Sequence, residues 1–268
     1  MRKRWISVVL MFLLIAGYIL LLRFNEQEDT NEAPQIVFEA THLELSVNDD
    51  SSRLMEGVKA VDKEDGDLTS GIIIDSISPF DNKKCRTVRY VVFDKGNKAA
   101  QAYRTISYVD YQSPKILLMD SLTQNTISVA KINRMFEAVS CVDGNISNNV
   151  EVNIGKLQDN EVVLKVHTYD STGTESNLSL VLEYDRNIYP ITITLQEYIL
   201  YVPAGESYDL TQNVKEILQG NQVMETYNEM IQIEGEIDFN TPGVYEVYYG
   251  LSDETETIAR TKGIVVVE

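Results

Sequence analysis

A pattern of alternating residues that recurs three times constrains the fold of this chain more than any other feature. The three runs are TVRYVVFD, which ends at Asp94, EVVLKVHTYD, which ends at Asp170, and GVYEVYYGLSD, which ends at Asp253. The residues two, four and six places before each aspartate are mostly apolar: Val92, Tyr90 and Val88, then Thr168, Val166 and Leu164, then Leu251, Tyr249 and Val247. Because side chains of a β-strand alternate between two faces, this period predicts three strands with one buried face each.

Each run is followed by turn residues and then by a second strand-like run, over residues 100–108, 177–184 and 257–267. This order predicts three β-hairpins. A proline opens each repeat, at Pro34, Pro114 and Pro190, which suits a strand start because proline has no amide hydrogen to donate. We therefore expect an all-β chain with three tandem β-sandwich domains of about seven short strands, at residues 33–111, 112–188 and 189–268. Residues 214–218 are the one place in the third repeat where we expect a helical turn.

The N-terminus carries a run without charged residues, from Trp5 to Leu22, directly after Arg2, Lys3 and Arg4. A helix of this length covers about 27 Å, which is enough to cross the hydrocarbon core of a membrane. Basic residues resist translocation and stay in the cytoplasm. We predict that residues 1–24 form a cytoplasmic tip and a single-pass transmembrane anchor, and that the C-terminal body lies outside the cell.

A cleaved signal peptide is the alternative, but its apolar core is usually only ~7–15 residues and precedes a small-x-small site, which this run lacks. Residues 25–32 are polar and acidic, and we interpret them as a short stalk between the anchor and the body.

The composition limits the partners of the body. The chain has 41 acidic and 23 basic residues and a formal net charge of −18, which excludes nucleic-acid binding through a basic surface. The charge indicates either simple solubility or an affinity for cations or basic partners. Cys85 and Cys141 fall in different repeats, so we expect free thiols rather than a disulfide bond.

Residues 57–69 (GVKAVDKEDGDLT) together with residues 88–100 (VRYVVFDKGNKAA) resemble the bacterial immunoglobulin-like repeat of Gram-positive surface proteins, a pattern similar to hyalin-type repeats. The second repeat keeps a reduced form at residues 138–147 and 169–173, and the third is similar at residues 205–209 and 241–245. The resemblance implies a row of immunoglobulin-like sandwiches on a cell surface, in a family of spacers and adhesive modules without assigned chemistry.

An acidic cluster in the first repeat is the best candidate site. Its members are Asp62, Glu64, Asp65 and Asp67, and Asp94 would approach them because the two loops share one end of an immunoglobulin-like sandwich. Ca²⁺ prefers six to eight oxygen ligands, which such residues can supply. The alternative is a turn in which these side chains accept backbone hydrogen bonds around Gly66.

No catalytic motif is recognisable, and His42 and His167 are isolated in the sequence. The tyrosines of the third repeat either form a surface patch for a protein or glycan or simply pack in strands: Tyr198, Tyr201, Tyr245, Tyr248 and Tyr249. We therefore expect a membrane-anchored, non-enzymatic surface protein with no cofactor, whose domains act as spacers and protein- or glycan-binding modules. A calcium-binding module with metal-stiffened joints is the alternative.

Overall fold

The structure is a computed structural model that describes residues 11, 13–20, 31–224, 230–252 and 256–268. Residues 11 and 13–20 are helical. Among the described residues, no helix has both the length and the apolar character that a membrane crossing requires. Half of the predicted span from Trp5 to Leu22, and most of the predicted stalk at 25–32, lies outside the described residues.

The described part of the chain is mostly β-structure, as the sequence predicts. The first repeat contains β1 (Gln35–Phe38), β2 (His42–Leu45), β3 (Val58–Asp62), β4 (Gly66–Asp67), β5 (Ile73–Ile77), β6 (Arg86–Phe93) and β7 (Ala99–Tyr108). The second contains β8 (Lys115–Leu118), β9 (Thr123–Gln124), β10 (Phe136–Ser140), β11 (Gly144–Asn145), β12 (Glu151–Ile154), β13 (Glu161–Tyr169) and β14 (Glu175–Tyr184). The third contains β15 (Thr192–Leu195), β16 (Ile199–Val202), β17 (Val214–Gln219), β18 (Gln222–Val223), β19 (Gln232–Glu234), β20 (Gly243–Ser252) and β21 (Thr257–Val267).

Helical segments within the three repeats are short. One α-helix, α2, spans Val129–Asn133 and begins at Ser128, whose hydroxyl accepts a hydrogen bond from the Lys131 amide. Short 3₁₀ turns span Ser51–Met55, Thr69–Gly71, Ser147–Asn149 and Leu210–Asn213. These segments connect strands and leave the β-sheets to form the framework.

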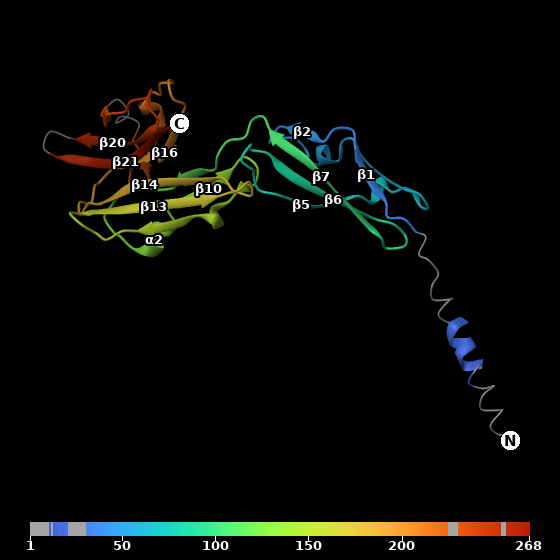
Figure 1. Ribbon diagram of the computed structural model, residues 1–268. Helices are drawn as coiled ribbons and strands as arrows, with labels where there is room; N and C mark the ends of the chain where they lie inside the picture. Colours follow the sequence, from blue (N-terminus) through green and yellow to red (C-terminus); the bar gives the residue numbers. More distant parts are fainter. Residues whose placement is uncertain (1–10, 12, 21–30, 225–229, 253–255) are drawn as a thin grey trace, which may run out of the picture. The chain divides into compact units, whose positions relative to one another are not determined.

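Each repeat contributes one three-stranded and one four-stranded sheet. The strand orders are β1-β3-β4 with β2-β7-β6-β5, β11-β10-β8 with β12-β13-β14-β9, and β15-β17-β18 with β16-β21-β20-β19. The chain changes sheet near the start of every repeat, and the second short strand then pairs in parallel with the last long strand: β2 with β7, β9 with β14, and β16 with β21. The predicted hairpins form the centre of each four-stranded sheet, as β13 and β14 illustrate (Figure 1).

The apolar residues that alternate with polar ones in the three sequence runs are buried in the structure. Val88, Tyr90 and Val92 are fully buried, and the corresponding residues of β13 and β20 are buried as well. On β13, Leu164 pairs with Leu180 of β14, and both side chains face the core. The side chains between them point the other way, which keeps water on one face and apolar contacts on the other.

The chain divides into two compact units. Unit 1 comprises Met1–Thr41, Met55–Ile77 and Val88–Arg104, and unit 2 comprises His42–Leu54, Ser78–Thr87 and Thr105–Glu268. All strands of the second and third repeats therefore belong to unit 2. The predicted domain boundaries after residues 111 and 188 stay predictions.

Unit 2 has two hydrophobic clusters. The first is built mainly from β8, β10, β13 and β14, and it also includes Ile199 and Ile264 from the third repeat. The second is built from the third repeat, and Tyr198 packs against both clusters. The second and third repeats are therefore joined by continuous apolar packing.

The expected helical turn at residues 214–218 is wrong. These residues lie in β17, where Ile217 pairs with Ile193 of β15 and is buried. The helical turn comes just before, at Leu210–Asn213, where the Asp209 carboxylate accepts the Thr211 amide. Backbone hydrogen bonds to the neighbouring strand β15 stabilise residues 214–218 as a strand, and the local preference for a helical turn is weaker than these bonds.

The burial pattern of β13 makes a direct prediction. Replacing Leu164, which is fully buried, by alanine should lower the free energy of unfolding by about 2–5 kcal/mol because it opens a cavity. The adjacent Val163→Ala, at a side chain 45% exposed, should cost less than about 1 kcal/mol. Urea denaturation of the two variants and the parent chain checks this, and equal losses would show that β13 has the wrong face in the core.

Candidate functional site

The predicted calcium ligands all lie in unit 1, where they form turns. Asp62 ends β3, and its Oδ1 accepts hydrogen bonds from the amides of Glu64 (2.9 Å) and Asp65 (2.7 Å). Asp67 accepts the Thr69 amide at 2.9 Å, and the hydrogen bonds from the side chain and then from the amide of Thr69 hold the pKa of Asp67 below its ordinary value. The residues are therefore brought close together, but largely as hydrogen-bond acceptors for their own backbone.

The second repeat builds the same turn with fewer acids. Ser140 takes the place of Asp62 and accepts the amides of Val142 and Asp143 at 3.1 and 3.3 Å. Asn145 takes the place of Asp67 and accepts the Ser147 amide at 2.9 Å. Because neutral residues make equivalent bonds there, the turn alone accounts for the position of the Asp67 carboxylate.

Asp65 connects the acidic turn to the β6–β7 hairpin turn. It accepts the Lys95 amide at 2.8 Å and forms an ion pair with the Lys95 amine at 3.0 Å. These contacts lower the pKa of Asp65, the hydrogen bond from the Lys95 amide being the largest cause. In the second repeat, Asp143 accepts both the amide and the hydroxyl of Ser171, so this connection also recurs.

Asp94 is buried at the start of the hairpin turn. Its Oδ1 accepts the Lys98 amide at 2.7 Å, and its Oδ2 accepts the Asn31 side-chain amide at 2.5 Å. Within the described residues, no three or more His, Cys, Asp or Glu side chains are grouped so as to hold a metal ion. Glu64 accepts only the Glu32 amide, at 3.4 Å, among the contacts described for it.

Asp62 differs from the other carboxylates of the cluster. The residue is only 4% exposed, and its Oδ2 has no hydrogen-bond partner among the described residues. Its counterpart Ser140 instead donates a hydrogen bond to Asp170, the counterpart of Asp94, at 3.1 Å. A carboxylate cannot donate this bond, so the first repeat leaves a buried polar oxygen without compensation.

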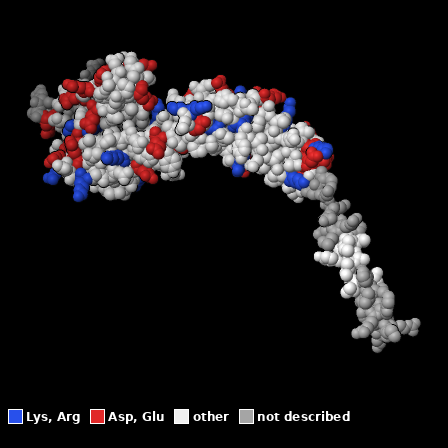
Figure 2. Space-filling model, in the orientation of Figure 1, with Lys and Arg blue, Asp and Glu red and all other residues white. Residues whose placement is uncertain are grey.

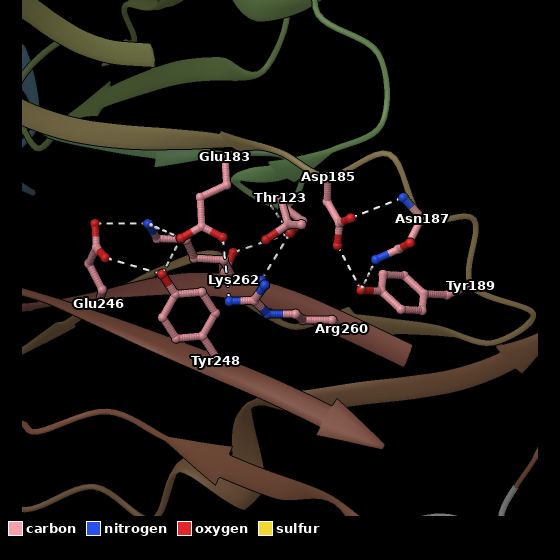
Figure 3. A network of polar contacts seen from close by, with 10 residues as sticks. Thr123, Glu183, Asp185, Asn187, Tyr189, Glu246, Tyr248, Arg260 and Lys262 are labelled. Atoms are coloured by element: carbon pink, nitrogen blue, oxygen red, sulfur yellow. Dashed lines mark hydrogen bonds and ion pairs between the residues drawn. The ribbon is translucent and has the colours of Figure 1, made fainter. Parts of the chain in front are cut away.

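A second candidate site lies in unit 2, at the junction between the second and third repeats. Lys262 of β21 is fully buried, and its amine lies 3.1 Å from Glu183 of β14 and 2.9 Å from Glu246 of β20 (Figure 3). Arg260 adds a further ion pair to Glu183 at 3.5 Å. A buried ammonium is costly unless carboxylates neutralise it, so these acids are required partners for the lysine.

Tyr248 of β20 completes the network (Figure 3). Its hydroxyl donates to Glu183, and its ring lies 4.6 Å from the Arg260 guanidinium and 5.3 Å from the Lys262 amine. Burial, and then the hydrogen bond to Glu183, raise the pKa of Tyr248. The phenol therefore stays protonated and remains a donor to the carboxylate.

Further hydrogen bonds tie the two repeats together along the backbone. Ser121 accepts the Lys262 amide at 3.0 Å, and the Leu122 amide donates to the Lys262 carbonyl at 3.2 Å. The Tyr201 hydroxyl both accepts from the amide and donates to the carbonyl of Ile116, each at 3.0 Å. Burial raises the pKa of Tyr201 to about 12, so this hydroxyl keeps the proton that it donates.

The tyrosines of the third repeat do not form one exposed patch. Tyr249 is fully buried in the core, and Tyr201 and Tyr248 make the junction contacts described above. Tyr245 donates to the Thr241 carbonyl at 2.9 Å. The sequence analysis did not identify Lys262 as a functional residue. The feature that could have indicated its burial is its position directly before the apolar run GIVVV of the last strand.

A polar pocket of about 270 Å³ opens at this junction. Its walls come from residues 120–125, from the connection between β14 and β15, and from the region around Arg260, which belongs to both the pocket and the ion network. Neither histidine lines it: His42 contacts Ser107 at 3.0 Å, and His167 contacts Asn177 at 2.9 Å. The lining residues of the pocket offer hydrogen-bonding groups for a polar ligand.

Cys85 and Cys141 are both free thiols, as expected.

No family model and no curated protein matches this chain. Among solved structures, one similar to it contains the CBM51-2 domain with GlcNAc and INT domains of Clostridium perfringens ZmpB, with 16% identity, 56% of this chain and 41% of that chain covered, and a TM-score of 0.24. The protocadherin GammaB4 extracellular domain is also similar, with 12% identity, 89% of this chain and 50% of that chain covered, and a TM-score of 0.20. Human CDH23 EC21-23 has 10% identity, with 88% of this chain and 100% of that chain covered, and a TM-score of 0.23. The chain spans less than half of each of the three ZmpB structures. Likenesses of this size assign the chain to no family.

The buried lysine predicts a specific pattern of stability. The double variant Glu183→Gln with Glu246→Gln should lose about 3–5 kcal/mol of unfolding free energy, because it leaves a buried ammonium without a counter-charge. Adding Lys262→Met should restore most of the loss, since no buried charge then remains.

A matched control is the exposed pair of Lys59 and Glu39, whose side chains are 62% and 68% exposed. Glu39→Gln should change stability by less than about 1 kcal/mol. Chemical denaturation of all four proteins measures these differences. A double variant no less stable than the control would show that the network does not hold the junction.

Proposed function

We propose that this chain is a non-enzymatic cell-surface protein, anchored in the membrane by residues 5–22, whose immunoglobulin-like sandwiches act as a spacer and present a protein- or glycan-binding surface outside the cell. The observation that supports the proposal most is the junction between the second and third repeats, which apolar packing and ion pairs hold together. A spacer must keep successive modules from hinging freely, and this junction has the contacts to do so.

Two features of the junction oppose hinging. Ile199 and Ile264 of the third repeat pack into the core of the second, so opening the junction would expose apolar surface. Opening would also separate Lys262 from Glu183, which lie on different repeats. Interfaces between domains normally permit motion unless they are large and apolar, so this combination favours a single stiff body.

The surface charge fits a body that remains soluble in front of a membrane. The chain carries a formal net charge of −18, and acidic side chains appear over both units with fewer basic ones among them (Figure 2). Anionic headgroups repel such a surface, which favours projection away from the membrane rather than adsorption to it.

Protease accessibility on intact cells tests the orientation. With the full chain carrying an epitope at each end, external protease should remove the C-terminal epitope and leave the N-terminal one intact, because the basic residues Arg2, Lys3 and Arg4 stay inside. Replacing all three by glutamate should reduce the exposed fraction. A C-terminal epitope that is digested only after permeabilisation would contradict the proposal.

Calcium binding in unit 1 is a second candidate function, and Asp62 is the observation that favours it. Asp62 occupies the position of Ser140, which in the second repeat donates a hydrogen bond to Asp170, the counterpart of Asp94. Its buried Oδ2 lacks a hydrogen-bond partner among the described residues, and Ca²⁺ accepts carboxylate oxygens together with amide carbonyls.

Thermal melting with Ca²⁺ and then with EDTA tests this candidate on the full chain. A ligand that binds only the folded state must raise the melting temperature, so the parent protein should melt higher with Ca²⁺. Asp62→Ser, which installs the residue of the second repeat, should remove the response without lowering stability in EDTA. A parent protein whose melting is unaffected by Ca²⁺ rules the site out.

A further inference from the structure

The pocket at the junction of unit 2 has the chemistry of a ligand site, and we infer that it binds a neutral, polyhydroxylated ligand, namely one saccharide unit. This inference rests on the proposed function, because it gives the presented binding surface a place and a ligand class. It draws on the size, the charge balance, the fixed polar groups and the aromatic rings of the pocket.

The size of the pocket limits its occupant. Pockets for drug-sized ligands have volumes of about 300–1,000 Å³, and this one has about 270 Å³. One sugar ring is of this order, whereas a folded partner or a long peptide is not.

The charges in the pocket are balanced, although the chain as a whole is strongly acidic. Asp120 and Asp185 line it together with Lys131 and Arg260. The basic groups already have partners, since Lys131 lies 3.9 Å from Asp120 and Arg260 lies 3.5 Å from Glu183. An ionic ligand would have to displace an existing pair, whereas a neutral ligand can use the remaining hydrogen-bonding capacity.

Several polar groups are held in fixed orientations. The Asp185 carboxylate accepts the Tyr189 hydroxyl at 2.7 Å and the Asn187 amide at 3.0 Å, as Figure 3 shows. A carboxylate has about four acceptor positions, so Asp185 retains some for the hydroxyls of a ligand. Gln124 is buried and donates to the Ser121 carbonyl at 2.5 Å, so its amide is also fixed.

One wall of the pocket contains a polar atom that lacks a partner. The Thr123 hydroxyl oxygen is buried and forms no hydrogen bond with any described residue. Buried hydroxyl groups normally find a partner, so this oxygen is an exception within the pocket wall.

Tyrosine and isoleucine residues supply the apolar part of the pocket lining. Tyr189 and Tyr198 line it together with Ile188, Ile191 and Ile193, and Tyr198 also packs against the cores of both repeats. A phenol ring is amphipathic and rigid, and it can cover the C–H face of a sugar while polar groups bind the hydroxyls. The combination of rings with carboxylates and amides favours a saccharide over a small polar ion.

Titration of the full chain in phospholipid nanodiscs, free of sugar-based detergent, tests the inference. The probes are methyl glycosides of neutral hexoses and N-acetylhexosamines, with inorganic phosphate and glutamate as ionic competitors, and calorimetry measures the dissociation constant. We expect at least one glycoside to bind with a dissociation constant of about 1 mM or tighter, which corresponds to a single small ligand. Phosphate and glutamate should bind more weakly.

Two variants locate the binding. Asp185→Asn should weaken it about tenfold, because it removes a charge-assisted hydrogen bond. Asn125→Ala, at an exposed residue of the pocket wall, should weaken it without affecting folding, and Asn48→Ala, also exposed but outside the pocket, should leave the affinity unchanged. Melting curves confirm that each variant is folded.

Binding by none of the glycosides overturns the inference, and so does tighter binding of phosphate or glutamate. Binding that is equally tight in the parent, Asp185→Asn and Asn125→Ala also overturns it, since the ligand then lies elsewhere. If the glycosides fail while protease still reaches the body from outside, the surface role stands and only the pocket assignment falls. If the body proves to be intracellular while the pocket binds, the reverse holds.

Discussion

The cost of burying an ammonium group determines how unit 2 is assembled. Lys262 is fully removed from solvent, and it is tolerated because Glu183 and Glu246 approach its amine from two different strands. Since Glu183 belongs to the second repeat and Lys262 to the third, this requirement links the two repeats. The hydrogen bond from Tyr201 to Ile116 also links the two repeats, and so do Ile199 and Ile264, which pack into the core of the second repeat.

The pocket is a consequence of that junction. Its walls come from both repeats, and Arg260 takes part in the ion network and the pocket lining at once. A ligand would therefore meet groups whose positions are fixed by the packing of the protein, which lowers the entropic cost of binding. In this way the contacts that hold the two repeats together also shape the pocket.

Comparison of the first and second repeats distinguishes the acidic residues whose positions the turn explains from the one acidic residue that it does not explain. Asp67 and Asn145 make the same bond to the following turn, and Asp65 and Asp143 both accept groups from the hairpin turn. These acids are therefore explained by the turn. Asp62 is different, because its counterpart Ser140 donates a bond that a carboxylate cannot donate, and its Oδ2 is buried without a hydrogen-bond partner among the described residues.

The sequence by itself determined the local structure of this protein: the buried faces of β6, β13 and β20, the hairpins, and the turns after Asp94 and Asp170. These depend on alternation and turn chemistry, which are properties of short segments. Tertiary structure decided that Val214–Gln219 is a strand, that Tyr248 contacts Glu183 at the junction, and that Lys262 is buried. A lysine on a strand looks solvent-exposed in sequence because its counter-charges are not adjacent to it: Glu246, 16 residues away, meets it in the β20–β21 hairpin, and Glu183, 79 residues away, meets it only when the two repeats pack.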